Sequence, residues 1–134
     1  MLFRSVLLLD SLGELVAYYA AADTAFVGGS LVPIGGHNLL EPLRVGRPVL
    51  TGPSTGNDAA TARLLLECGA AKTVTDARTL ADALITFWDA PDLGESAVRA
   101  GQRVLQGNQG AVRRVCAALG PLIATQDPSG VSGQ

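Results

Sequence analysis

The residues that could do chemistry gather after an apolar run, in the segment FVGGSLVPIGGHNLLEP (residues 26–42). Gly35 and Gly36 lack Cβ atoms, so the backbone there can adopt a positive φ and approach a bound group closely. Asn38 suits the N-cap of a helix beginning near Leu39, and the free amides of such a helix start attract anions. The segment therefore indicates a binding site for a ligand that carries phosphate.

Three polar side chains in this segment extend that interpretation but also allow a simpler one. His37 offers an acid or donor, Asn38 an amide and Glu41 an acceptor for hydroxyl groups, and a sugar nucleotide would use all three. Asn38 and Glu41 also have the N-x-x-E spacing of a capping box, which would only close the first helical turn. His37 is the only histidine, and a solitary loop histidine is usually just polar surface. From the residues alone, both interpretations of Asn38 and Glu41 stay open.

Composition excludes several classes of ligand. The 134 residues, 48% of them hydrophobic, are enough for one domain with its own core. Ten Lys and Arg against twelve Asp and Glu give a net charge of −2, so there is no basic field for nucleic acid or anionic lipid. With one histidine and no acidic cluster, we expect no metal site. No apolar stretch approaches the about 20 residues that cross a bilayer.

The two cysteines predict neither a disulfide nor a metal pair. Cys68 and Cys116 lie in apparently helical segments without C-x-x-C spacing. We therefore expect both to be reduced core residues, in a cytosolic environment.

Strand and helix signals alternate along the chain, with glycines and helix-capping residues between them. Strands are expected over residues 6–9, 24–28, 48–51 and 72–75, and helices over residues 11–22, 39–45, 58–68, 77–88, 93–105 and 110–119. A break is expected over residues 107–110, and residues 126–134 are too rich in Pro, Gly and Ser to be anything but a flexible tail.

Repeated βα units predict a parallel sheet flanked by helices, with ligands at the carboxyl ends of the strands. The glycine pairs would occupy such an end. Their spacing is not that of G-x-G-x-x-G, and the chain has neither a G-x-x-x-x-G-K-[ST] loop nor a G-x-S-x-G elbow. A nicotinamide enzyme, an NTPase and a serine hydrolase are therefore disfavoured.

Four motifs carry a resemblance to a known family: DSLGEL (residues 10–15), FVGGSLVPIGGHNLLEP (residues 26–42), GRPVLTGP (residues 46–53) and NQGA (residues 108–111). In this order and spacing they resemble the carboxy-terminal half of the 3-deoxy-D-manno-octulosonic acid (Kdo) transferases, over about residues 6–119. The resemblance implies a Rossmann-like parallel sheet flanked by helices, part of the carboxy-terminal domain of a GT-B glycosyltransferase. It also implies CMP-Kdo as donor and no metal or other cofactor.

The resemblance implies a set of residues that contact the CMP moiety: Gly13, Glu14, Leu15, Gly35, Gly36, His37, Asn38, Leu39, Leu40 and Glu41. Glu41 would fix the ribose, and helix-start amides would stabilise the departing phosphate. From the residues alone, the first three fit an ordinary helix turn equally well. Arg44 and Arg47 are expected to be solvated charges at a helix end, and we assign no catalytic residue.

The chain departs from the family pattern in two places. Asp58 follows Asn57 where the family usually has an aromatic residue, which puts the local loop contacts in doubt. The chain also begins midway through the donor domain, so we expect a fragment, soluble and inactive by itself. Residues 1–125 would be the donor-binding domain, truncated at its amino-terminal side, and residues 126–134 the tail.

In the whole enzyme, the resemblance implies that an upstream acceptor domain would bind the lipid A precursor. That domain would carry the catalytic carboxylate and act at the cytoplasmic face of the inner membrane in Gram-negative bacteria, during lipopolysaccharide synthesis. The membrane contact would belong to the full-length protein only. Two alternatives are another GT-B enzyme that uses a UDP-sugar and a non-catalytic nucleotide-binding module.

Overall fold

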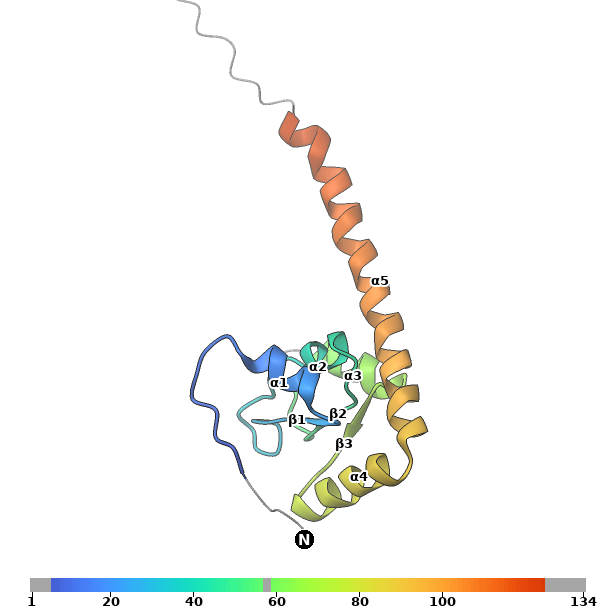
Figure 1. Ribbon diagram of the computed structural model, residues 1–134. Helices are drawn as coiled ribbons and strands as arrows, with labels where there is room; N and C mark the ends of the chain where they lie inside the picture. Colours follow the sequence, from blue (N-terminus) through green and yellow to red (C-terminus); the bar gives the residue numbers. More distant parts are fainter. Residues whose placement is uncertain (1–5, 57–58, 125–134) are drawn as a thin grey trace, which may run out of the picture.

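The computed structural model describes residues 6–56 and 59–124. In this part of the chain, three strands form one parallel sheet in the order β1-β2-β3 (Figure 1). The strands are β1 (Ala25–Val27), β2 (Val49–Thr51) and β3 (Ala71–Thr73). Because the order in space follows the order in sequence, each parallel connection needs a crossover, and a helix supplies it.

The five helices of the described residues are α1 (Leu15–Ala21), α2 (Leu40–Arg44), α3 (Ala59–Glu67), α4 (Ala77–Asp89) and α5 (Pro91–Ala124). The alternation of helix and strand from α1 to α4 is as the sequence predicts, with ends shifted by a few residues. Residue 58, where the helix over residues 58–68 was expected to begin, and the expected tail at residues 126–134 lie outside the described residues.

The core has two parts, one on each face of the sheet. On one face, Val27 and Val49 pack with Leu43 of α2 and Leu65 of α3, and part of α5 covers this cluster. On the other face, Leu50 packs with the residue that follows β3 and with residues of α4. Val49 and Leu50 point to opposite faces because successive strand side chains alternate. Strand β2 is therefore buried on both sides, as the central strand of a parallel sheet must be.

The expected strand at residues 6–9 does not form. Val6, Leu7 and Leu8 are 99%, 73% and 85% exposed, and the segment has no regular structure. A strand is stable only when a neighbour accepts and donates its backbone hydrogen bonds. Within the described residues, no strand pairs with this segment.

The expected break at residues 107–110 is also absent, because α5 continues through it as one helix of 34 residues. A glycine inside a helix costs only about 1 kcal/mol relative to alanine, so Gly107 need not end the helix. Figure 1 shows the carboxy-terminal part of α5 extending away from the sheet and the other helices. None of the described helices is long and apolar enough to span a membrane.

The prediction that both cysteines lie in the core is wrong. Cys68 and Cys116 are free, as expected, but both are exposed. Cys68 follows the last turn of α3, and Leu65, one turn earlier, takes the buried position. The apolar character of a thiol does not decide which face of a helix it occupies.

Candidate functional site

Two loops at the carboxyl edge of the sheet form the candidate site. The glycine loop (residues 28–38) follows β1, and the β2 loop (residues 52–56) follows β2. In parallel sheets flanked by helices, this edge is where ligands bind. The predicted placement of the glycine pairs at a strand end is therefore confirmed for this fold.

The two loops are joined through Ser30, which is fully buried. Its hydroxyl donates to the carbonyl oxygen of Val27 at 2.6 Å and accepts from the amide of Gly52 at 2.7 Å. Its carbonyl oxygen accepts from the amide of Ser54 at 2.9 Å, and the amide of Gly36 donates to the carbonyl of Ser54 at 2.9 Å. The glycine loop is thus held at both its start and its end.

Different physical constraints require glycine at different positions of the loop. Gly29 and Gly35 have φ of +74° and +90°, which other residues rarely adopt. Gly36 has no positive φ, but a Cβ there would lie 3.2 Å from Ser30 Cβ and from the carbonyl oxygen of Ser54. The close approach that Gly36 permits is therefore to the β2 loop, and its amide is already used.

Asn38 and Glu41 lie together, but not as a capping box. Asn38 Oδ1 accepts from the amide of Leu40 at 2.9 Å, and Asn38 Nδ2 lies 3.4 Å from Glu41 Oε1. The N-cap of α2 is Leu39, one residue later than expected, and it makes no side-chain cap hydrogen bond. The capping-box interpretation is therefore wrong, and an amide and a carboxylate lie side by side at the end of the loop.

At this site an anion would be bound by individual backbone amides, not by a helix dipole. Helix α2 has only five residues, so little macrodipole can develop, and the predicted contribution of a helix start is small. The amides of His37, Asn38 and Leu39 have no hydrogen-bond acceptor within the described residues. The Leu39 side chain is buried in the core, so this residue has only its backbone to offer. His37 is exposed and its ring lies over Gly29.

The segment Gly13–Leu15 forms the start of α1, and the ordinary-turn interpretation fits its local structure. Gly13 has φ of +90°, and Glu14 is the N-cap of the helix. The carboxylate of Glu14 accepts from the hydroxyl of Ser11. No hydrogen bond or ion pair joins this segment to residues 35–41 in the part of the chain that the structure describes.

Helix α1 nevertheless packs against α2, and the pKa of Tyr19 is sensitive to that contact. Burial raises the pKa of the Tyr19 phenol, and the negative charge of Glu41 raises it further. The tyrosine and the carboxylate are therefore close enough to interact. The spacing of four residues predicts Tyr19 on the same side of the helix as Leu15, but it does not indicate the contact with Glu41.

The prediction of solvated charges holds for Arg44 and fails for Arg47. Arg44 is exposed in the last turn of α2. One terminal nitrogen of Arg47 donates to the carbonyl oxygen of Ala20 at 2.5 Å, and Arg47 Nε is buried. Arg47 thus ties the end of α1 to the chain that enters β2.

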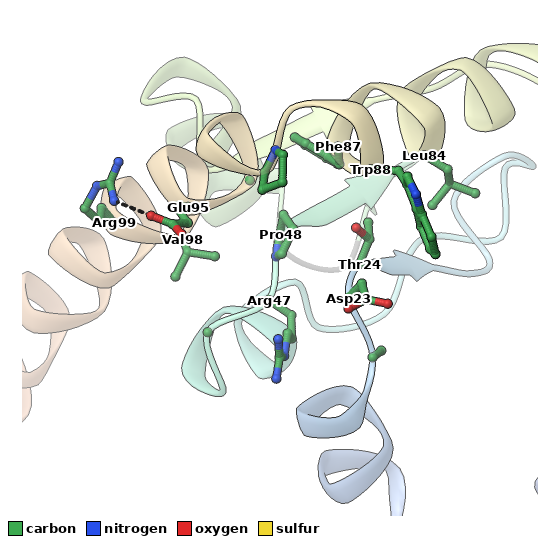
Figure 2. A pocket seen from close by; sticks show the side chains of 14 residues that line it. Asp23, Thr24, Arg47, Pro48, Leu84, Phe87, Trp88, Glu95, Val98 and Arg99 are labelled. Atoms are coloured by element: carbon green, nitrogen blue, oxygen red, sulfur yellow. Dashed lines mark hydrogen bonds and ion pairs between the residues drawn. The ribbon is translucent and has the colours of Figure 1, made fainter.

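A cavity much larger than the space at the glycine loop lies at the opposite edge of the sheet (Figure 2). It has a volume of about 900 Å³ and is lined by residues before β1 and β2, by α4 and by the start of α5. Figure 2 shows Trp88 extending beside Thr24 and Asp23. None of the residues predicted to contact the nucleotide lines this cavity. At the glycine loop, a small crevice of about 10 Å³ lies between His37 and Thr55.

Within the described residues, no group of three His, Cys, Asp or Glu side chains could hold a metal ion. The candidate site is therefore built from backbone amides, one amide side chain and one carboxylate, with His37 beside them.

The chain is similar to proteins whose names state an activity. It is 42% identical over 114 residues to the 3-deoxy-D-manno-octulosonic acid transferase of Bordetella pertussis, covering 85% of this chain and 27% of the relative. It is 41% identical over 119 residues to the transferase of the same name from Haemophilus influenzae, covering 88% of this chain and 28% of the relative. No protein-family model matches the chain.

The fold also matches a solved structure, a crystal structure of the carboxy-terminal CMP-Kdo binding domain of WaaA from Acinetobacter baumannii. The TM-score is 0.71 at 35% sequence identity, covering 73% of this chain and 51% of that one. The predicted fold class, a parallel sheet flanked by helices in the manner of such a domain, is confirmed by this match.

Proposed function

We propose that this chain, which is a homologue of the Kdo transferases, forms part of the donor-binding domain of such an enzyme and binds the CMP portion of CMP-Kdo. The chain spans only 27–28% of the length of the two curated relatives described above. The observation that carries the proposal is the arrangement at the carboxyl edge of the sheet, where a fixed glycine loop ends, beside Asn38 and Glu41, in amides that have no acceptor among the described residues.

Each part of the loop has a proposed role toward the nucleotide. The amides of His37, Asn38 and Leu39 donate to the phosphate, and the Glu41 carboxylate accepts from the ribose hydroxyls. The Asn38 side chain already contacts Leu40 and Glu41, so it holds the carboxylate in place. Gly35 supplies the turn that brings these groups to one place. Leu39 and Leu40 contribute to the site through their backbone groups.

The start of α1 is proposed as a second wall of the nucleotide site. Gly13 turns the chain, and Glu14 and Leu15 are exposed at the start of a helix that packs against α2. This packing supports the proposal because it places α1 beside the helix that carries Glu41. The Glu14 carboxylate then adds a further acceptor for hydroxyl groups.

In the whole enzyme, the proposed reaction is inverting transfer of Kdo to a lipid A precursor at the inner membrane of a Gram-negative bacterium. An acceptor hydroxyl loses its proton to a base, its oxygen bonds to the anomeric carbon of Kdo, and the bond from that carbon to the CMP phosphate oxygen breaks. Residues 1–125 hold the leaving CMP. Amides that donate to the phosphate stabilise the charge that grows there. We assign no base within this chain.

A nucleotide titration tests the proposal. CMP is added to the isotopically labelled chain, with UMP and AMP as comparisons, and amide shifts are followed. We expect selective CMP shifts at residues 13–15 and 35–41. Equal shifts with all three nucleotides would instead indicate a generic phosphate site, and the absence of any shift would overturn binding by this chain.

Two variants sharpen the titration. Asn38→Ala and Glu41→Gln are each expected to weaken CMP binding about tenfold, because each removes a polar contact from the site. Glu67→Gln is the matched control, since Glu67 pairs with Arg63 on the surface of α3 and lies outside the proposed site. If Asn38→Ala and Glu41→Gln bind CMP as tightly as the control Glu67→Gln, the nucleotide lies elsewhere.

A further inference from the structure

Ser30 is a buried polar residue whose hydrogen bonds serve two loops at once. Ser30 and Thr51 are the fully buried polar residues among those described. The Ser30 hydroxyl uses its one proton toward Val27 and accepts the proton of the Gly52 amide. Its backbone carbonyl accepts a third hydrogen bond, from Ser54. The hydroxyl therefore satisfies groups that would otherwise be buried without partners.

The side chain of Ser30 is tightly packed against the glycine loop. A Cβ on Gly36 would lie 3.2 Å from Ser30 Cβ, so the end of the glycine loop passes directly over this side chain. Gly36 is held there by its hydrogen bond to Ser54, which in turn is bound to Ser30. Gly36 immediately precedes His37 and Asn38. The position of Ser30 consequently determines where the unpartnered amides of the loop begin.

We propose that Ser30 is a positioning residue of the nucleotide site, which it does not contact itself. By joining the ends of β1 and β2, it fixes the loop in the conformation that presents His37 and Asn38. A loop ordered beforehand does not lose that conformational freedom when the ligand binds, so affinity is higher. This inference rests on the proposed function and adds to it the residue that sets the geometry of the site.

The main test compares Ser30→Ala with Thr51→Val. Ser30→Ala leaves the Gly52 amide without its partner, whereas Thr51→Val removes a buried hydroxyl nearby, whose hydrogen bond to the Gly52 carbonyl is long at 3.3 Å. Both variants are expected to lose stability. Only Ser30→Ala is expected to weaken CMP binding, by about tenfold, and to speed amide hydrogen exchange at Gly36 and Ser54.

A rescue and a milder variant complete the test. Ser30→Cys is nearly isosteric with serine, but its thiol is a weaker donor and acceptor, so it is expected to recover part of the CMP affinity that Ser30→Ala loses. Gly36→Ala, whose φ is not positive, pushes the Ser30 and Ser54 contacts apart by a few tenths of an ångström. It is expected to lower CMP affinity with little loss of stability. If Ser30→Ala does not fold, the CMP affinity of Gly36→Ala decides whether the positioning role holds.

The outcomes separate this inference from the proposed function. If the wild-type chain binds CMP and Ser30→Ala binds it equally well, the positioning role is overturned and the proposed function stands. A loss of affinity in Thr51→Val as large as that in Ser30→Ala would also overturn the role, since general destabilisation would explain both. If the wild-type chain does not bind CMP, the proposed function fails, and the positioning role fails with it.

Discussion

Gly52 lies so close to Ser30 that a Cβ on Gly52 would be 2.2 Å from the Ser30 carbonyl oxygen and 2.6 Å from the amide nitrogen of Leu31. Both of those atoms belong to the backbone, so no change of side-chain rotamer can relieve the contact. The carboxyl ends of β1 and β2 are therefore in direct backbone contact at the base of the candidate site.

Gly52→Ala is expected to destabilise the chain by about 2 kcal/mol or more, because the backbone of one loop must move. Gly56→Ala is the matched control in the same loop. A Cβ on Gly56 meets no atom within 4 Å and its φ is not positive, so its effect should stay within about 0.5 kcal/mol. Urea denaturation measures both. Equal midpoints would show that the two loops are not in contact in solution.

Leu43 of α2 packs against Gly101 of α5, where a Cβ would lie 2.7 Å from Leu43 Cδ2. Leu43 is fully buried, so Leu43→Ala should cost about 2–5 kcal/mol. Gly101→Ala alone should also destabilise, because its methyl group overlaps that leucine. In the double variant the methyl group enters the space that the leucine left, so its cost should be smaller than the sum of the two. Strict additivity would contradict this packing.

The sequence predicted those parts of the fold that depend on local signals. A helix was expected over residues 77–88, and α4 spans Ala77–Asp89, with Asp76 and Thr79 forming a reciprocal capping box at its start. The glycine pairs were expected at the end of a strand, and the loop after β1 contains them. Such features depend on a few neighbouring residues, so their spacing along the chain is sufficient evidence.

The parts that could not be predicted depend on distant partners. The segment at residues 6–9 is apolar enough for a strand, but its structure is decided by whether another strand lies beside it. Arg47 was expected in solvent because nothing in the sequence shows that Ala20 lies within reach. The role of Ser30 depends on Gly52, which is 22 residues away. The GGS run indicates a small polar residue in a tight turn, but not its partner.

The capping box of α4 predicts a pH-dependent stability. Hydrogen bonds from the Thr79 amide and hydroxyl hold the pKa of the Asp76 carboxyl below its usual value. A lowered folded pKa stabilises the fold above the unfolded pKa, about 4, and this stability is lost as pH falls through the folded value. Asp76→Asn caps the helix without titrating. The melting temperatures of the two proteins should therefore converge between about pH 5 and pH 3. If the two melting temperatures differ by the same amount at every pH, the ionised Asp76 carboxylate does not stabilise the fold through this capping box.

The contact between α1 and Glu41 can be measured through Tyr19. The pKa of Tyr19 is raised first by burial and then by the charge of Glu41. Glu41→Gln should therefore lower the Tyr19 pKa but leave it above its usual value, because the effect of burial remains. The measurement is the absorbance of the phenolate in a Tyr18→Phe background, where Tyr19 is the only tyrosine left of the two in the chain.

Glu14→Gln is the control for this titration, because Glu14 is also on the α1 side of the site but is not a cause of the Tyr19 shift. It should leave the Tyr19 pKa unchanged. The raised pKa also means that folding loses stability above about pH 10, when the phenol ionises, and Glu41→Gln should reduce that loss. If Glu41→Gln has no effect on Tyr19, α1 does not lie beside Glu41. The proposed second wall of the nucleotide site would then be lost, while the glycine loop and its contacts with the β2 loop would remain.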